Sequence, residues 1–290
     1  MSEHDDFSRK QFEEALSDAE DALRADPSVV FGSESEKARR FFCRIKARSW
    51  VWERSGFCMF RGCAEKSIRH SHSIQRSGSI ERIAEIQHVL TPRMNHRGQM
   101  KMQSTGINTA STFPGFCEKH EQLFSMFEAS RSISTGQHVA LQAFRTLCRE
   151  LFRTRQELAE MEALLDEYRT KRADFFSAAI HKVDPSVEVS ECSVRDDEIE
   201  KSLSKQVKGL TMTMSELAND LYSEFFEYLT SKAEEPCLYA MSLPFEVPVS
   251  LSGLGSLNCI YQSKRHRVLC LLGVMPQAGS TLAFVGAELL

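Results

Sequence analysis

Two short motifs of cysteine and histidine constrain this chain of 290 residues more than any other feature. The first is Cys58-x4-Cys63 and the second is Cys117-x2-His120. Thiolates and imidazoles are the usual ligands of tetrahedral zinc, and a spacing of roughly two to four residues lets one turn present a pair of them. We therefore predict a single four-ligand zinc site that closes the loop between the motifs. Unconnected core cysteines are the alternative.

The segment around these motifs, residues 55–128, is irregular and rich in Gly, Ser and Thr, with only short strand-like pieces such as 88–91. A long, weakly structured stretch inside a compact domain is usually functional or held in place by a cross-link. A bound zinc ion would supply that cross-link. His70 and His72 lie between the motifs and are alternatives to one of the four ligands.

Composition and cysteine usage indicate a soluble intracellular protein. Hydrophobic residues make up 42% of the chain and charged residues 26%, which is ordinary for a globular protein. No run approaches the ~18 to 20 apolar residues that a membrane helix needs, and the acidic N-terminus lacks the basic start of a secretory signal. The nine cysteines, an odd number, indicate free or metal-bound thiols in a reducing compartment. We expect a cytoplasmic protein without membrane contact.

Charge is distributed unevenly along the chain, although the net charge is only −4. Residues 1–36 carry −8, residues 37–103 carry +11, and the remainder carries −7. A basic block in an acidic protein is typical of a face that binds a polyanion. The alternative is a basic surface that docks on the acidic segments of the same chain.

Apolar residues recur every seven positions in two later segments. The first series is Phe144, Leu151, Leu158 and Leu165, and the second contains Leu203, Leu210 and Leu217. Heptads predict helices that pack along one seam, so we expect an antiparallel helical hairpin or coiled coil with a loop near 182–195. Such a hairpin would serve internal packing or the assembly of a homo-oligomer.

We expect an α+β fold that is mostly helical and has four parts. These are an acidic N-terminal helical segment (1–36) with an amphipathic helix at 7–25, a basic zinc-binding module (37–130) with a helix at about 37–52, the helical hairpin (137–232) and a small β-rich C-terminal region (236–290). The last region consists of short β-rich runs separated by Gly and Pro, which favours a small antiparallel sheet.

Residues 58–128 resemble a divergent HNH-type module, the ββα-metal or treble-clef class of endonucleases. Such modules place a cysteine pair ahead of a short strand with the catalytic histidine, as in Ser71-His72-Ser73-Ile74-Gln75 here. They place a second ligand pair at the start of a helix, as in Phe116-Cys117-Glu118-Lys119-His120. The same C…GC…SH…FC-x2-H pattern is similar to that of uncharacterised bacterial proteins, some of them in phage defence.

The resemblance implies a metal-dependent phosphodiesterase chemistry. His72 would be the general base that takes a proton from the attacking water, and Mg2+ or a similar divalent ion would stabilise charge on the scissile phosphate. Asn108 or Asn95 would orient His72, and Glu121 would bind Mg2+. The phosphates of DNA or RNA would be held by Arg61, Lys66, Arg69 and Arg76.

Two positions depart from the pattern of that family. Ser71 stands where the family has an Asp or His that binds the catalytic metal, and Glu121 stands where the helix normally adds a His or Asn. The alternative to an endonuclease is therefore a non-catalytic, zinc-stabilised binding or scaffold protein that assembles through its helical hairpin.

Overall fold

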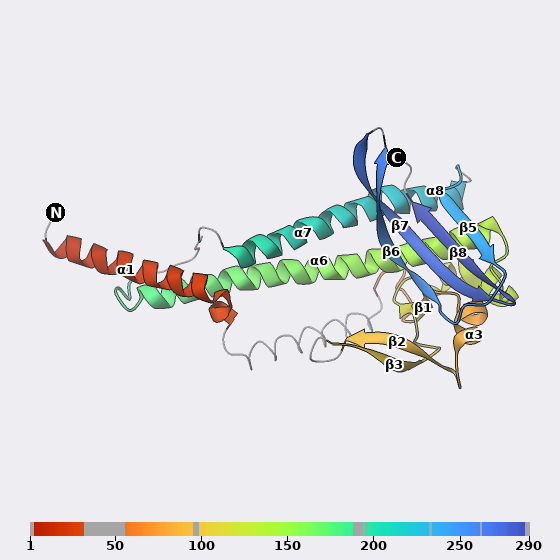
Figure 1. Ribbon diagram of the computed structural model, residues 1–290, viewed down its shortest axis with the longest axis horizontal. Helices are drawn as coiled ribbons and strands as arrows, with labels where there is room; N and C mark the ends of the chain where they lie inside the picture. Colours follow the sequence, from red (N-terminus) through yellow and green to blue (C-terminus); the bar gives the residue numbers. More distant parts are fainter. Residues whose placement is uncertain are drawn as a thin grey trace. The chain divides into compact units, whose positions relative to one another are not determined.

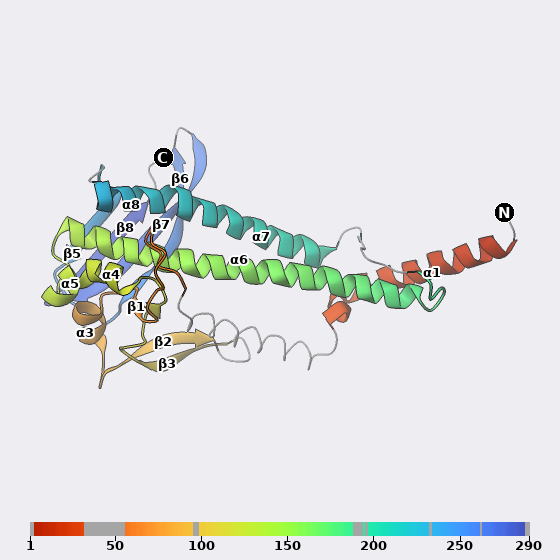
Figure 2. The ribbon, with the colours of Figure 1, turned by 180° about the vertical axis from the view of Figure 1, so that it is seen from behind.

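The computed structural model of the chain describes residues 3–31, 56–94, 99–187, 194, 197–231, 234–261 and 263–287 (Figure 1 and Figure 2). It combines helices and strands, as expected for an α+β fold. The helix predicted at about 37–52 and Asn95 lie outside these residues. The chain divides into two compact units, one formed by residues 1–44 with 156–212 and the other by residues 45–155 with 213–290.

These two units cut across the four predicted parts. Helix α6 (Gly136–Ile180) contributes its first part to the second unit and its last part to the first unit. Helix α7 (Glu198–Ser215) continues through a π-helical segment, η4 (Glu216–Leu221), into α8 (Tyr222–Ser231), and this run is also divided. The predicted hairpin therefore belongs to both units, whereas residues 45–130 of the predicted zinc-binding module share a unit with the C-terminal region.

In the first unit, α1 (Glu3–Ala25) buries an apolar stripe against α6 and α7. Ala19 and Leu23 of this stripe lie in one cluster with Leu165, Tyr168 and Leu203. The helix ends at Ala25 and a short 3-10 turn over Pro27–Phe31 follows, because a residue before proline disfavours the helical conformation. The predicted amphipathic helix at 7–25 is confirmed.

A buried ionic network joins α6 to the start of α7. The Tyr168 hydroxyl donates to Asp197 Oδ2 at 2.8 Å, and Arg172 donates to the same carboxylate at 2.6 Å and to Glu200. Asp197 also accepts a bond from the Glu200 N–H at 2.9 Å, which caps the first turn of α7. The end of α6 is thus fixed against the beginning of α7, as an antiparallel hairpin requires.

The core of the second unit is rich in aromatic side chains. Six phenylalanines are fully buried in one cluster: Phe113, Phe116, Phe124, Phe127, Phe144 and Phe225. The heptad residues Leu147 and Leu151 of α6 lie in the same cluster, and the ring of Phe144 meets that of Tyr222 in α8 with centroids 5.4 Å apart. The beginning of α6 therefore packs against the end of the second helical run, which completes the antiparallel pairing.

The C-terminal region forms a four-stranded antiparallel sheet, as predicted. Its strands are β5 (Leu238–Leu243), β6 (Leu251–Tyr261), β7 (Lys264–Gln277) and β8 (Ser280–Ala287), in the order β5-β8-β7-β6. Leu269, Leu271 and Phe284 on these strands join the aromatic core of the second unit. Gly279 adopts φ +70° in the tight turn between β7 and β8, a conformation that glycine reaches without a steric cost.

Residues 56–133 contain more regular structure than the sequence indicates. Two antiparallel strand pairs are present, β1 (Ser71–His72) with β4 (Thr112–Phe113) and β2 (His88–Met94) with β3 (Met100–Gly106). The helical pieces are η2 (Arg76–Ile80), α3 (Glu81–Ile83), α4 (Glu118–Glu121), η3 (Gln122–Phe124) and α5 (Ser125–Ser130). The strand-like piece at 88–91 is confirmed as part of β2.

None of the helices in the described ranges carries an apolar stretch of the length that crossing a bilayer requires.

Candidate metal centre

The first two ligands of the predicted zinc site lie in a tight loop before β1. An isolated bridge between Phe57 and Lys66 closes this loop, and the Cys58 N–H donates to the Glu65 carbonyl at 2.8 Å. Gly62 adopts φ +80°, which lets the chain reverse direction just before Cys63. The loop therefore presents both thiols toward the same point.

The other two ligands lie at the beginning of α4. Cys117 occupies the N-cap position with an extended backbone, and its carbonyl accepts the Glu121 N–H at 2.8 Å. Residues three apart face the same side of a helix, so Cys117 and His120 point in one direction. In both motifs, the local backbone conformation alone places two ligand atoms on the same side.

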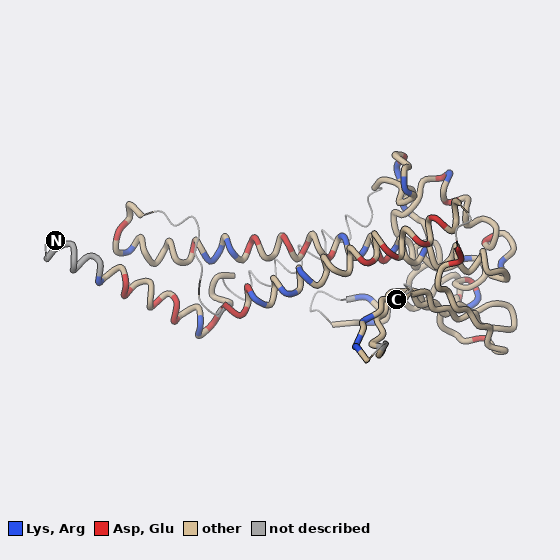
Figure 3. Tube along the Cα trace, turned by 90° about the horizontal axis from the view of Figure 1, so that it is seen from above, with Lys and Arg blue, Asp and Glu red and all other residues tan. Residues whose placement is uncertain are grey.

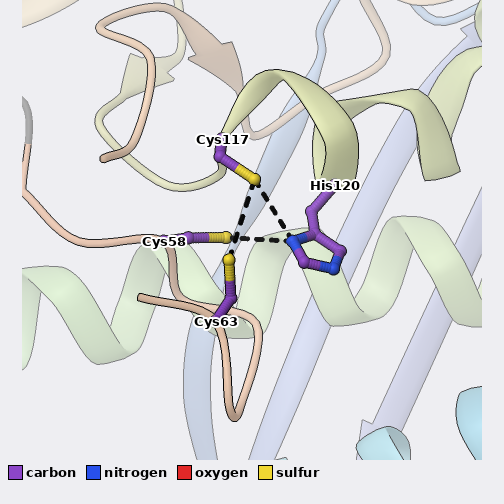
Figure 4. A group of neighbouring side chains, drawn as sticks. All are labelled: Cys58, Cys63, Cys117 and His120. Atoms are coloured by element: carbon purple, nitrogen blue, oxygen red, sulfur yellow. Dashed lines mark hydrogen bonds between the residues drawn. The ribbon is translucent and has the colours of Figure 1, made fainter. Parts of the chain in front are cut away.

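Figure 4 shows the four side chains converging on one point. All four ligand atoms lie within 4.8 Å of one another. The His120 Nδ1 atom is 3.4 Å from Cys58 Sγ and 3.2 Å from Cys117 Sγ, and the Cys63 and Cys117 sulfurs are 3.9 Å apart. A tetrahedral zinc with bonds of about 2.0 to 2.3 Å sets its ligand atoms roughly 3.5 to 3.8 Å apart. The cluster could therefore hold a metal ion such as zinc.

The surroundings of the cluster act on the two buried thiols in opposite directions. Burial raises the pKa of Cys58 to about 11, so this thiol would have to lose its proton to bind a metal ion. Burial also opposes ionisation of Cys117, but backbone N–H groups of His120 and Lys119 and the neighbouring thiols hold the pKa of Cys117 below its ordinary value. The Phe60 ring stacks on the His120 ring at 4.1 Å and fixes the orientation of the imidazole.

His70, the alternative ligand, does not join this cluster. Its side chain is exposed and lies outside the group of converging ligand atoms. In the part of the chain that the structure describes, no second group of three or more Cys, His, Asp or Glu side chains converges in this way.

His72 occupies the end of β1 and is almost completely buried, with 8% of its surface exposed. The ring nitrogen Nδ1 lies 3.0 Å from the Ala110 carbonyl oxygen. A carbonyl only accepts, so Nδ1 carries the proton and Nε2 holds the lone pair. Burial and the positive charge of Arg145 lower the pKa of His72 to about 4. Asn108 is exposed, and the backbone at Ala110 orients the imidazole instead.

Glu121, the predicted ligand of a hard metal ion, is part of an internal ionic cluster. Arg145 of α6 is 2% exposed, and its guanidinium donates to Glu121 and, at 2.8 Å, to Glu128. The same guanidinium lies 4.5 Å from the ring centre of Phe124. Glu121 therefore neutralises a buried cation, and its expected role as a Mg2+ ligand stays a prediction.

Glu128 was not anticipated from the sequence. Besides Arg145, it accepts bonds from the backbone N–H groups of Arg76 and Ser77 at 3.2 and 3.0 Å. Burial opposes its ionisation, but Arg145 and these amides keep the pKa of Glu128 below its ordinary value. A single acidic residue in a short helix gives no sequence signal for such a role.

The four predicted phosphate-binding residues fall into two pairs. The Arg61 guanidinium lies over the rings of Tyr222 and Phe226 and donates to Ser223 Oγ at 2.8 Å, so it anchors the cysteine loop to α8. Arg76 faces Glu81 at 3.6 Å. By contrast, Lys66 and Arg69 are exposed, and no ion pair within the described ranges involves either. Arg61 is exposed as well and the Arg76 side chain is 43% exposed, so the two pairs differ in their side-chain partners and not in access to solvent.

No match to the chain was found in comparisons with protein-family models, with curated proteins and with solved structures.

Proposed function

We propose that this protein is a zinc-stabilised nucleic-acid-binding protein. The observation that carries the proposal is the convergence of Cys58, Cys63, Cys117 and His120, with tetrahedral spacing, in the segment that also exposes Lys66 and Arg69. Four protein ligands leave no open coordination position, which is the pattern of a structural rather than a catalytic zinc site. The order of cysteine loop, β1–β4 pair and ligand-bearing helix supports the resemblance to a treble clef.

The zinc ion would hold together elements that have little stability of their own. Helix α4 continues through η3 into α5, and this helical run over residues 118–130 is about the length at which an isolated helix is only marginally stable. Zinc would tie it to the cysteine loop, which is itself anchored to α8 by Arg61. The metal would therefore fix the position of the exposed cations that follow Cys63.

Exposed cations are found on three loops or hairpins of the second unit. In addition to Lys66 and Arg69, β2 and β3 bring Arg93 opposite Lys101, and the beginning of β7 carries Lys264, Arg265 and Arg267. Along α6, by contrast, Lys and Arg are interspersed with Asp and Glu, whereas α7 begins with Glu198 and Glu200 and then carries Lys201, Lys205 and Lys208 (Figure 3). Exposed cations bind phosphates by releasing counterions, and these three sites belong to the same unit as the Cys/His cluster, so we place the nucleic acid on the second unit.

The experiment is a salt titration of binding to short labelled DNA and RNA, measured by fluorescence anisotropy on protein with a measured zinc content. We expect affinity to fall steeply between about 50 and 200 mM salt. The double variant Lys66→Ala with Arg69→Ala should lower the slope of log affinity against log salt by about 2, because each lost phosphate contact removes roughly 0.9. Lys205→Ala with Lys208→Ala on α7 is the control with the same charge change. Equal effects of both pairs, or no binding, would contradict the proposal.

Endonuclease activity is the second candidate, and one observation favours it. The hydrogen bond of His72 Nδ1 to Ala110 leaves Nε2 as the acceptor, the tautomer that a general base needs. Its low pKa and burial make it a weak and poorly accessible base. The test is Mg2+-dependent cleavage of plasmid DNA and of RNA by the wild type and by His72→Asn. Asparagine keeps a donor toward Ala110 and removes Nε2, so cleavage should disappear with the zinc content unchanged.

A further inference from the structure

A cavity of about 270 Å³ lies in the second unit on the side of β2 and β6. Its apolar lining includes Ile74, Ile80, Ile83, Val89, Leu90 and Leu251. None of the four metal ligands lines it, and neither does His72. The cavity is therefore a feature separate from the metal centre and from the candidate general base.

Three serine hydroxyls lie at the polar side of this cavity. The Oγ atoms of Ser111, Ser250 and Ser252 are buried, and none has a hydrogen-bond partner among the described residues. Ser252 as a whole is only 9% exposed. A buried hydroxyl without a hydrogen-bond partner is unfavourable. Three such hydroxyls around one cavity indicate that a ligand with polar atoms supplies the missing hydrogen bonds.

The backbone at Ser111 is built to hold one of these hydroxyls in place. Ser111 adopts φ +59°, an uncommon conformation for a residue with a side chain. Its carbonyl accepts bonds from the N–H and the hydroxyl of Ser73, at 2.8 and 2.9 Å. Such conformations persist only where neighbours enforce them, and they concentrate at ligand sites.

Arg149 of α6 supplies a positive charge to the same cavity. Its Nη1 donates to Glu150 Oε1 at 2.5 Å, and Arg153 contacts the other oxygen of that carboxylate at 2.8 Å. Two arginines thus share one buried carboxylate, which leaves a net positive charge. A guanidinium has five N–H donors, and this bond uses one of those of Arg149.

We propose that this cavity binds a small molecule with an anionic head group, a carboxylate or a phosphate monoester, on an aliphatic body. The head group would bond to Arg149 and the serine hydroxyls, and the body would lie against the isoleucine, valine and leucine side chains. The lining contains no aromatic ring on which a nucleobase could stack, so the ligand differs from the nucleic acid proposed above.

Isothermal titration calorimetry of the full-length, zinc-loaded protein tests the proposal with three probes of one chain length. These are octanoate, octyl phosphate and uncharged 1-octanol. At least one of the two anions should bind with one-to-one stoichiometry and at least tenfold more tightly than the alcohol, and the tighter anion identifies the head group. Arg149→Met should weaken the binding of that anion at least tenfold and leave 1-octanol within about twofold, since a charge-assisted bond is lost only with the anions.

Arg153→Met is the matched control, because Arg153 pairs with the same carboxylate but does not line the cavity. It should change anion binding less than about threefold. Ser252→Val provides a second test, because it removes one of the three hydroxyls without altering Arg149, and it should weaken binding of the tighter anion at least threefold. Circular dichroism and zinc content confirm folding of each variant. Equal losses in the two arginine variants, equal affinity for 1-octanol, or no binding of either anion would overturn the proposal.

Discussion

His72 is held in its neutral form by its surroundings. Burial and the charge of Arg145 lower its pKa to about 4, and the Ala110 carbonyl fixes the proton on Nδ1. We expect the ring signals of His72 in 15N NMR spectra to stay constant at neutral pH and to move only near pH 4. The His72→Asn spectrum identifies these signals by their absence. A midpoint near the ordinary value of about 6.5 would show that the imidazole is solvated.

The same pKa shift gives stability a pH dependence of definite sign. The unfolded chain takes up a proton at His72 near pH 6.5, whereas the folded chain resists it down to about 4. The contribution of neutral His72 to the free energy of unfolding is therefore complete above pH 6.5 and is lost as the pH falls toward 4. The loss is about 3 kcal/mol, because a difference of one pKa unit corresponds to about 1.36 kcal/mol. In urea titrations the stability of His72→Asn should fall less over this interval than that of the wild type. Parallel curves would contradict this.

Arg145 neutralises two carboxylates from inside the core. Its removal would leave Glu121 and Glu128 facing each other without a cation. We expect Arg145→Gln to lower the free energy of unfolding by about 3 kcal/mol or more, because breaking a buried ion pair leaves an uncompensated charge. Arg131→Gln is the control, since Arg131 is 66% exposed in its pair with Glu81 and such pairs contribute about 1 kcal/mol or less. Similar losses in both variants would show that burial does not strengthen the Arg145 cluster.

These residues also show where prediction from the sequence stops. Spacing within one turn is a local property, so the motif Cys117-x2-His120 could be identified without a structure. The pairing of Arg61 with Ser223 joins residues 162 positions apart, and Glu121 meets Arg145 from another helix. From charge and residue type alone, Arg61 was predicted to contact phosphate and Glu121 to contact a metal ion. Their partners within the chain could not be predicted, because the tertiary fold alone brings these residues together.

At the scale of elements, the proposed zinc site would fix the beginning of a short helical run. Helix α4 spans Glu118–Glu121 and begins at a ligand, Cys117. We expect Cys117→Ala to lose bound zinc, measured by mass spectrometry of the metal content, and to weaken the near-ultraviolet circular dichroism of the surrounding aromatic residues. Structural zinc contributes directly to folding, so loss of one ligand is costly.

The control for this variant is Cys237→Ser, because Cys237 is exposed and lies outside the cluster. It should keep its zinc and its spectrum. Retention of one zinc per chain in Cys117→Ala, with an unchanged spectrum, would show that the cluster is not a metal site.

Elements with a strong period were easier to predict than elements held by distant contacts. The heptads of α6 and α7 and the β-rich C-terminal runs identified the hairpin and the sheet, because a repeated apolar face must be buried. The β1–β4 pair joins two residues on each strand across almost forty intervening positions, and no local pattern marks so short a pairing. The π-helical segment η4, which interrupts the second helical run, has no sequence signal either.

At the scale of the whole molecule, the chain has two compact units and α6 contributes to both. Tyr168 and Leu165 lie in the core of the first unit, whereas Phe144 and Leu147 lie in the core of the second. The heptad series that predicted the hairpin thus serves two separate cores within one chain. This internal packing accounts for the heptads, and assembly of a homo-oligomer through them stays a prediction.

Removal of the metal should affect the two units unequally, because all four ligands belong to the second unit. We expect chelation to speed hydrogen exchange of the amides between Cys58 and Ser130, where the cysteine loop and α4 depend on the ligands. The amides of α1 and of the Tyr168–Asp197 network belong to the first unit and should keep their protection. Mass spectrometry of peptides, before and after chelation and again after zinc is restored, measures both regions in one experiment. Exchange that rises equally in both would mean that the chain unfolds as one cooperative body, whereas unchanged exchange near Cys117 would mean that the metal stabilises neither unit.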